Sequence, residues 1–237
     1  MKFFKTTDLN NELRKKSSFS ALQYLIKDFF KKKIVYVCSF GSESAVLLHM
    51  ISKINNDLPI IFLNTHKLFK ETLSYKTKLI NQFSLKNVME CFPDDQELMN
   101  NDSNDLLWRE NADLCCKIRK INPLNKKLEK FDAWISGRKA YQSGERAEKN
   151  FLEFQDNKYI ISPLLNWNKK QIEQYFQRNN LPHHPLVSQG YQSIGCKNCT
   201  LKTIKNSSNP RSGRWSGLEK TECGIHFSKN QNQKFLG

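Results

Sequence analysis

The stretch Ile34-Val-Tyr-Val-Cys-Ser-Phe-Gly-Ser-Glu-Ser44 decides the fold, because an apolar run leads directly into a turn of small and hydroxylated residues. Residues 34–38 are continuously apolar and rich in β-branched side chains, which is typical of a strand buried on both faces. Residues 45–51 then have the apolar density of a helix that packs on a sheet. The stretch therefore predicts a strand, a turn and a helix in succession.

The same pattern recurs along the chain. Residues 59–63 predict a second strand and residues 70–83 a second helix, and this alternation predicts a parallel sheet. Further expected elements are strands at 87–91, 132–136 and 159–163, surface helical pieces within 94–113, and an amphipathic helix at 169–179. We therefore expect an α/β fold with a doubly wound, mostly parallel sheet.

The composition divides the chain into two unequal parts. Residues 1–200 hold all the expected strands and helices and predict one nucleotide-binding α/β domain. From residue 201 the sequence turns polar, and residues 202–214 are rich in Ser, Asn, Gly and Pro. Residues 201–237 are therefore expected to form a flexible C-terminal tail, with a hinge at residues 202–210.

Hydropathy and targeting signals indicate the compartment. No stretch approaches the roughly 20 apolar residues that a membrane span needs. The start, Met1-Lys-Phe-Phe-Lys5 and onward, lacks the apolar segment and small-residue cleavage site of a secretory signal. We therefore expect a cytoplasmic protein with no membrane partner.

The charge balance indicates an anionic partner. The formal net charge is +15, and such self-repulsion is more easily tolerated when phosphate or sulfate groups neutralise part of it. Yet the basic residues are scattered over the chain, without one dense tract interleaved with aromatic residues. This pattern favours a small anionic nucleotide in a basic cleft, and we expect no nucleic-acid partner.

The turn at residues 39–44 is a candidate anion site. It joins a buried strand to a helix N-terminus, where free backbone N–H groups and the helix dipole attract an anion. Gly41 would allow a close approach of the backbone, and Ser39, Ser42 and Ser44 would add hydroxyl donors. It is not a Walker A loop, which requires G-x-x-x-x-G-K-[ST]. The alternative interpretation is an N-cap cluster without a ligand.

Four of the seven cysteines form a candidate metal site. Cys115 and Cys116 are adjacent, whereas Cys196 and Cys199 form a C-x-x-C motif far downstream. Soft thiolates suit zinc or an iron-sulfur cluster, and vicinal cysteines suit a cluster with several irons better than one tetrahedral ion. A redox C-x-x-C motif and buried apolar cysteines remain alternatives. The other two cysteines in apolar runs, Cys38 and Cys91, are expected in the core.

The seventh cysteine, Cys223, lies near the end of the polar tail. We expect an exposed thiol flanked by Lys220 and His226, whose positive charge would favour the reactive thiolate. A tail could carry this thiol to a substrate and then to another protein. Taken alone, Cys223 could equally be an incidental surface cysteine.

Taken together, these segments resemble the assimilatory sulfonucleotide reductases, the adenylylsulfate (APS) and phosphoadenylylsulfate (PAPS) reductases. The resemblance implies a fold of the adenine nucleotide α-hydrolase (PP-loop) type. It rests on segments that occur in order over most of the chain: Ser39-Phe-Gly-Ser-Glu-Ser-Ala45, Leu63-Asn-Thr-His-Lys-Leu-Phe-Lys-Glu-Thr72, Cys115-Cys-Lys-Ile-Arg-Lys120, Ser136-Gly-Arg-Lys-Ala-Tyr-Gln-Ser-Gly-Glu-Arg146, His184-Pro-Leu186, Gly190-Tyr-Gln-Ser-Ile-Gly-Cys-Lys-Asn-Cys-Thr200, Gly213-Arg-Trp215 and Glu222-Cys-Gly-Ile-His226.

The resemblance implies a two-step covalent mechanism. Cys223 would attack the sulfate sulfur, release AMP and become an S-sulfocysteine, from which thioredoxin or a glutaredoxin-like thiol donor would free sulfite. The implied cofactor is a [4Fe-4S] cluster held by four metal ligands: Cys115, Cys116, Cys196 and Cys199. The implied substrate-binding residues are Lys120, Arg211 and Arg214 for the phosphosulfate, Ser39, Gly41, Ser42, Gly137 and Arg146 for the adenosine and 5′-phosphate side, and His226.

The resemblance also implies which nucleotide is used. Family members with all four cluster cysteines are generally APS reductases, so APS is the expected substrate and PAPS the alternative. Departures from the family pattern are Phe40 for the first Gly and Glu43 for the Asp of S-G-G-x-D-S, and Asn64 and His66 in L-D-T-G. A PP-loop ATP-dependent enzyme and a zinc-stabilised nucleic-acid-binding module are the competing classes. The oligomeric state stays open, with a homo-oligomer among the options.

Overall fold

The computed structural model describes residues 6–142, 146, 149–203, 209–217 and 220–228 of the 237-residue chain. Its centre is a six-stranded sheet of order β3-β2-β1-β4-β6-β5. All neighbouring strands pair in parallel except β5, which runs antiparallel to β6 at one edge. The strands are β1 (Ile34–Cys38), β2 (Ile60–Leu63), β3 (Val88–Cys91), β4 (Ala133–Ile135), β5 (Leu152–Gln155) and β6 (Lys158–Ile161).

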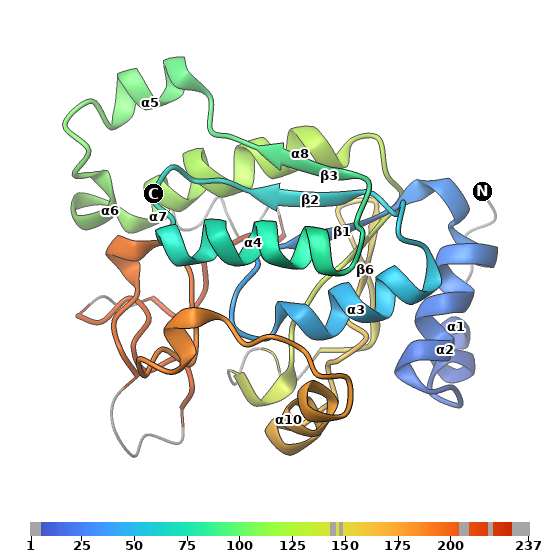
Figure 1. Cartoon of the computed structure of the whole chain (residues 1–237). Coiled ribbons are helices and arrows are strands. Elements are labelled where there is room, and N and C mark those ends of the chain that lie inside the picture. Colours follow the sequence, from blue (N-terminus) through green and yellow to red (C-terminus); the bar gives the residue numbers. More distant parts are fainter. Residues whose placement is uncertain (1–5, 143–145, 147–148, 204–208, 218–219, 229–237) are drawn as a thin grey trace.

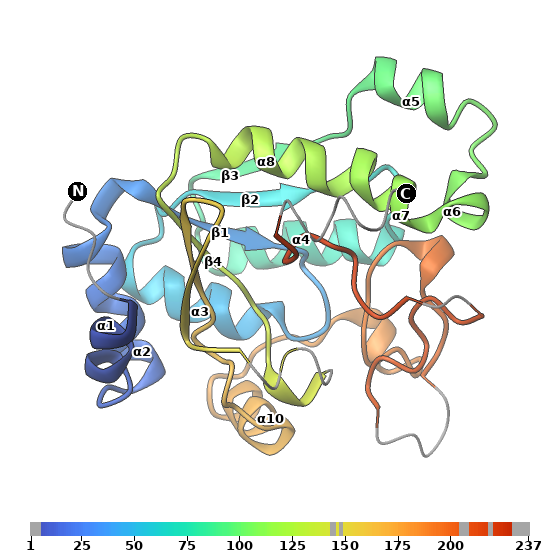
Figure 2. The same ribbon diagram turned by 180° about the vertical axis from the view of Figure 1, so that it is seen from behind.

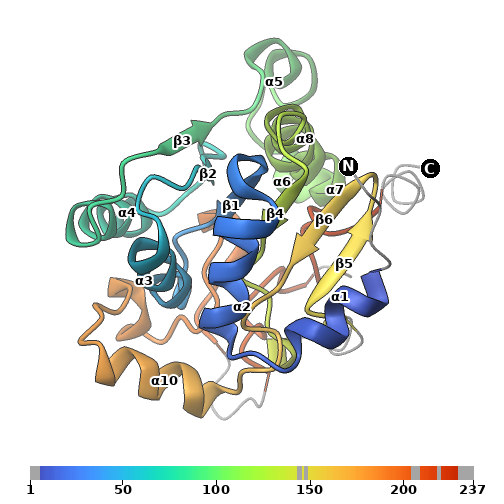
Figure 3. The same ribbon diagram turned by 90° about the vertical axis from the view of Figure 1, so that its right-hand side faces the viewer.

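Helices cover both faces of the sheet, as predicted. In Figure 1, α3 (Ser44–Ile54) and α4 (Lys70–Gln82) lie on the near face, and Figure 2 shows α8 (Asn122–Leu128) across the opposite face. The end-on view in Figure 3 separates these two helical layers. Strand β1 contributes side chains to the hydrophobic clusters on both faces of the sheet. Tyr36 packs in the cluster beneath α3, whereas Val35 and Val37 pack in the cluster beneath α8. This two-sided burial explains its unbroken apolar sequence.

The remaining helices complete the domain. At the N-terminal side lie α1 (Thr6–Leu13) and α2 (Ser18–Tyr24), and α10 (Lys169–Arg178) packs on α3. The expected surface pieces are α5 (Asp95–Asn101) and α6 (Leu107–Glu110), whereas α7 (Ala112–Cys116) extends beyond the expected range and ends in two buried cysteines. Shorter turns are π-helical at Leu25–Phe29 and Lys117–Ile121 and of 3₁₀ type at Lys31–Lys33, Ala140–Gln142, Pro185–Val187 and Lys197–Cys199.

The edge strand β5 is not among the strands predicted from the sequence. It is a strand of four residues at the end of the sheet order, and of these residues Leu152 is buried whereas Phe154 is exposed. Asn10 of α1 caps this strand by donating to the carbonyl of Leu152 at 2.7 Å and accepting from its N–H at 3.0 Å. The strand therefore depends on a contact with a residue far away in the sequence.

The described parts of the C-terminal tail lie against the domain at the carboxyl ends of the strands (Figure 1, orange to red). Leu201 donates its N–H to the carbonyl of Gly213 at 2.7 Å, and Ile225 packs against the core cluster beneath α8. Residues 204–208 of the expected hinge lie outside the described residues, so the motion of the tail stays a prediction. Within the described ranges, the structure has no helix with the length and apolarity needed to cross a bilayer.

Candidate functional site

A cavity of about 210 Å³ opens at the carboxyl ends of β1, β2 and β4. In parallel α/β sheets, ligands bind at this edge, where strands and helix N-termini meet. The tail closes one side of the cavity. Every residue that the sequence assigned to substrate binding or nucleophilic attack lines it: Ser39, Gly41, Ser42, Lys120, Gly137, Arg146, Arg211, Arg214, Cys223 and His226. Their roles in binding and catalysis stay predictions.

The turn after β1 contains a backbone conformation typical of glycine, although the residue that adopts it is a phenylalanine. Phe40 has a φ of 49°, in the left-handed region that favours glycine. Its side chain is fully buried and meets the ring of Phe62 edge-on at 5.3 Å between centroids. Gly41 follows, where an added Cβ would lie only 3.3 Å from the carbonyl oxygen of Ile194. Packing of the buried Phe40 ring therefore stabilises a backbone conformation that glycine would adopt without strain.

Glu43 ends this turn in a buried polar network. Its carboxylate forms an ion pair with Lys139 at 2.6 Å and accepts hydrogen bonds from Gln142 at 2.9 Å and from the Tyr141 hydroxyl. Burial opposes ionisation, but Lys139 and Tyr141 outweigh it, so the pKa of Glu43 is lowered. Glu43 thus anchors the loop to the segment after β4, a role that its sequence position did not reveal.

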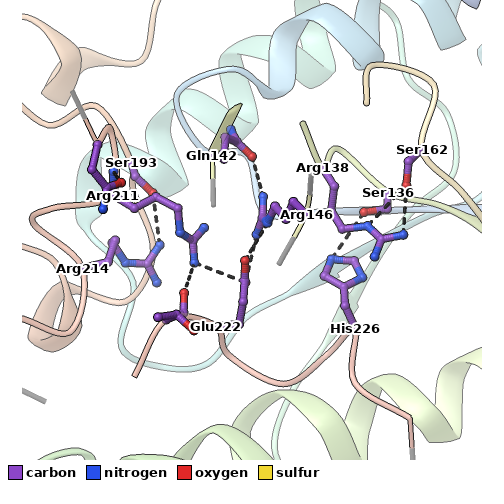
Figure 4. Close-up of polar contacts among 12 residues, drawn as sticks. Ser136, Arg138, Gln142, Arg146, Ser162, Ser193, Arg211, Arg214, Glu222 and His226 are labelled. Carbon is purple, nitrogen blue, oxygen red and sulfur yellow. Dashed lines mark hydrogen bonds and ion pairs between the residues drawn. The ribbon is translucent and has the colours of Figure 1, made fainter. Parts of the chain in front are cut away.

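Arg138 and Lys139, in the segment after β4, are both paired with carboxylates of the protein. Arg138 forms an ion pair with Glu153 of β5 at 2.5 Å and donates to Ser162 from two nitrogens, at 3.3 and 3.0 Å (Figure 4). Lys139 pairs with Glu43. Both cations are therefore engaged by the protein itself.

Three arginines gather on the tail side of the cavity (Figure 4). Arg211 and Arg214 lie over the ring of Trp215, with 5.3 and 4.3 Å between each guanidinium carbon and the ring centroid. Arg214 also donates to the carbonyl of Cys199 at 3.3 Å. Burial and the neighbouring cations Arg146 and Arg214 lower the pKa of Arg211 to about 10. Such crowding of partly buried positive charge creates a strong local preference for an anion.

Glu222 partly neutralises these arginines. Its carboxylate accepts from Nε of Arg146 at 2.6 Å and from Nη2 at 2.9 Å, and it accepts from Arg211 at 3.2 Å. Burial opposes ionisation of Glu222, but Arg146 and Arg211 outweigh it and lower the pKa of the carboxyl. This pairing was not predicted from the sequence, since 76 residues separate Arg146 from Glu222.

The surroundings of Cys223 differ from the expectation. The thiol is partly buried and lines the cavity, whereas we expected it to be exposed. His226 stacks on Trp134 with 4.9 Å between centroids and an angle of 8°, and it pairs with Ser136 at 3.3 Å. Burial and neighbouring cations such as Arg138 place the pKa of His226 well below its ordinary value. His226 is therefore neutral and adds no positive charge beside the thiol.

Lys120 lies between the tail and the cysteines. A π-helical turn, Lys117–Ile121, follows α7 and directs Lys120 into the interior, where its Nζ lies 3.9 Å from Sγ of Cys116. Such π-helical turns recur at functional sites. Burial opposes its charge, but interaction with Cys116, Cys196 and Cys223 outweighs it, and the pKa of Lys120 is raised. Lys120 is thus the cation that links the cysteines to the cavity.

The four predicted metal ligands surround Lys120 from two segments. Cys115 and Cys116 are buried at the end of α7, while Cys196 is buried and Cys199 partly buried at the turn Lys197–Cys199. Burial raises the pKa of the Cys115, Cys116 and Cys199 thiols, whereas at Cys196 burial is outweighed by Lys120 and the Thr65 hydroxyl, which lower its pKa. In the described part of the chain, no group of three or more His, Cys, Asp or Glu side chains is arranged to hold a single metal ion. Cys38 and Cys91 are buried, which confirms their assignment to the core.

Polar contacts join the segment of Cys115 and Cys116 to the segment of Cys196. Thr65 places its hydroxyl 3.2 Å from Sγ of Cys196, and Arg119 donates to the carbonyl of Thr65 at 3.0 Å. Arg119 also forms a buried ion pair with Asp102, whose carboxylate accepts from the N–H of Leu107 at 2.8 Å. The two cysteine-bearing segments are therefore joined through a buried polar chain.

Sequence comparison identifies relatives that match over most of the chain. Residues 33–202 match the phosphoadenosine phosphosulfate reductase domain family. An adenosine 5′-phosphosulfate reductase of Mesorhizobium japonicum is 42% identical over 202 residues, which cover 85% of this chain and 79% of the relative. The enzyme of the same name from Bacillus mycoides is 38% identical over 229 residues, covering 94% of this chain and 95% of the relative.

Structural comparison agrees with the sequence. A phosphoadenylyl-sulfate (PAPS) reductase from Candida auris, solved with phosphate, has a TM-score of 0.71 and 26% identity, covering 83% of this chain and 96% of that one. A Candida glabrata FMN adenylyltransferase has a TM-score of 0.55 at 17% identity, covering 98% of this chain and 88% of that one, and so shares only the fold. The fold prediction is confirmed. On the match over residues 33–202 and the identity to its full-length relatives, the chain belongs to the phosphoadenosine phosphosulfate reductase family.

Proposed function

We propose that the chain is an APS reductase that converts adenylylsulfate to sulfite and AMP in sulfate assimilation, using thioredoxin or a glutaredoxin-like thiol donor in the cytoplasm. The observation that carries the proposal is the position of Cys223. Its thiol lines a cavity together with the buried Lys120 and the partly buried Arg211 and Arg214. The relatives that match over most of their length are named adenosine 5′-phosphosulfate reductases.

The chemistry proceeds by two displacements. The thiolate of Cys223 attacks the sulfate sulfur, an S–S bond forms, and the bond from sulfur to the bridging oxygen breaks, so AMP leaves with the electron pair. A thiolate of the dithiol donor then attacks Sγ of Cys223, and sulfite leaves with the electron pair of the cleaved S–S bond. The second donor thiol resolves the mixed disulfide, which returns Cys223 as a thiol and leaves the donor oxidised.

The cations of the cavity make the first displacement possible. A thiolate that approaches a phosphosulfate meets like charge, and fixed guanidinium and ammonium groups offset that repulsion. Each charge-assisted hydrogen bond contributes about 1.5–3 kcal/mol. Lys120 and Arg214, which contact the cysteine segments, and Arg146 all line the cavity, so it offers several cationic groups to the substrate.

The four cysteines near Lys120 fit a [4Fe-4S] cluster in their donor chemistry. They supply four soft sulfur ligands, three of them buried, and Lys120 lies close enough to offset the negative charge of thiolates. Ligands to a cluster bind different iron atoms and therefore need not converge on one point. A bound cluster would supply a fixed charge and a rigid link between the segments of Cys116 and Cys196. The thiols of Cys223 and the donor carry the electrons of the reaction.

The proposal also specifies which of the two nucleotides, APS or PAPS, is the substrate. The four cysteines and the names of the relatives favour APS, whereas the Candida auris neighbour is a PAPS reductase. The test is anaerobic purification followed by turnover of APS and of PAPS, each with thioredoxin. We expect sulfite from APS at a kcat/KM far above that for PAPS. Higher activity with PAPS would reverse the assignment, and no sulfite from either nucleotide would refute the proposed function.

A further inference from the structure

Glu222 binds two of the arginines that the sequence assigned to the substrate, Arg146 and Arg211. Its carboxylate binds the Nε and Nη2 edge of Arg146 at 2.6 and 2.9 Å and reaches Arg211 at 3.2 Å. Only 6% of the Glu222 side chain is exposed. Figure 4 shows Arg146 and Arg211 converging on this carboxylate from opposite sides. The tail thus places an anion of its own in the cationic part of the cavity.

This pairing leaves little of Arg146 for a ligand. Two of its nitrogens bind Glu222, and the third, Nη1, donates to Gln142. A guanidinium binds carboxylate, phosphate and sulfate through the same planar edge, with two parallel hydrogen bonds. A phosphate or sulfate group can therefore take that edge of Arg146 only when Glu222 leaves it.

The charge of the arginines couples the departure of Glu222 to the binding of another anion. Arg146, Arg211 and Arg214 are crowded together, and burial plus this crowding lowers the pKa of Arg211. A buried charge that loses its partner is costly, so Glu222 departs at little cost only when another anion takes its place. The incoming nucleotide supplies such an anion.

We propose that Glu222 is a positioning residue that competes with the substrate's phosphate or sulfate for Arg146 and Arg211. Binding of the anion displaces Glu222 and so shifts the adjoining Cys223. The inference rests on the proposed function, because it takes a sulfonucleotide as the incoming anion. It also explains why two residues assigned to the substrate are engaged within the protein.

The test measures anion affinity in the full-length chain by calorimetric titration with AMP and, separately, with inorganic sulfate. Glu222→Gln keeps the shape of the side chain but removes its charge, so we expect AMP to bind about tenfold more tightly than to the wild type. Equal or weaker binding by a folded Glu222→Gln protein would overturn the proposal. A purely structural role for Glu222 predicts such a loss.

Lys220→Gln is the matched control. Lys220 ties the same segment to Asp113 of α7 through an ion pair, whereas the Glu222 carboxylate binds Arg146 and Arg211. This variant should loosen the tail without freeing the arginines, so its AMP affinity should stay within about twofold of the wild type. If Lys220→Gln tightens binding as much as Glu222→Gln, loosening of the tail explains the gain and the competition is refuted.

Alkylation of Cys223 in the wild type provides a second measurement that does not depend on the folding of a variant. We expect added AMP to change the alkylation rate by iodoacetamide severalfold, because it shifts the segment of Glu222 and Cys223. A rate independent of AMP would contradict the exchange. Sulfite production from APS with unchanged anion affinity in Glu222→Gln would refute the competition alone, whereas tighter anion binding without any sulfite would refute the proposed function alone.

Discussion

Replacing Phe40 by glycine tests how this chain holds its nucleotide loop with a bulky residue. Phe40 is fully buried and has a φ of 49°. Loss of a buried phenyl ring costs about 3–5 kcal/mol of unfolding free energy. Relief of the left-handed strain returns about 1–2 kcal/mol. We therefore expect Phe40→Gly to destabilise the protein by about 3 kcal/mol and Phe40→Ala, which keeps the strain, by about 4 kcal/mol.

Urea titration and thermal melting of the wild type and the two variants measure this order. At this chain length, 3 kcal/mol corresponds to a fall in Tm of about 6–12 °C. At an ordinary position with negative φ, alanine would be the more stable of the two replacements. An alanine variant more stable than the glycine variant, or a glycine variant as stable as the wild type, would refute the reasoning about Phe40.

Three further predictions concern the site and its supports. A Cβ at Gly195 would collide with the guanidinium of Arg214, so Gly195→Ala should weaken AMP binding about tenfold in titrations with little change in Tm; unchanged affinity would contradict the placement of Arg214. Burial lowers the pKa of His184 to about 4, whereas the unfolded chain takes up this proton near pH 6.5, so stability should fall by about 3 kcal/mol between pH 6.5 and 4. Urea titrations at the two pH values should show a smaller loss of stability in His184→Gln than in the wild type. Equal losses in the two proteins would contradict the assignment of this pH dependence to His184. Cys116→Ser should abolish the visible absorbance of an iron-sulfur cluster, and anaerobically purified wild type that contains zinc without iron or sulfide would refute the cluster.

Local sequence patterns were sufficient for the central part of the fold. Residues 34–38 are apolar throughout because both faces of β1 are covered, and the polar turn that follows marks the ligand edge of the sheet. The edge strand β5 could not be predicted in this way. Only Leu152 of its four residues is buried, and the strand is held by Asn10, which is 142 residues away in the sequence.

Residue types and motifs also identified the residues that line the cavity, but not what those residues contact. The pairing of Glu222 with Arg146 joins two segments that only the folded chain brings together. His226 was expected to add positive charge near Cys223, whereas burial against Trp134 keeps it neutral. Solvation and long-range pairing depend on the tertiary structure, so a linear pattern does not reveal them.

The most direct test of the proposed function is the covalent intermediate on Cys223. Wild-type protein mixed with APS in the absence of a thiol donor should gain the mass of one sulfonate on the peptide that contains Cys223, and thioredoxin should then release one equivalent of sulfite. Cys223→Ser should show neither the adduct nor sulfite, while keeping any visible iron-sulfur absorbance. Sulfite release by Cys223→Ser, or an adduct on another cysteine, would contradict the account.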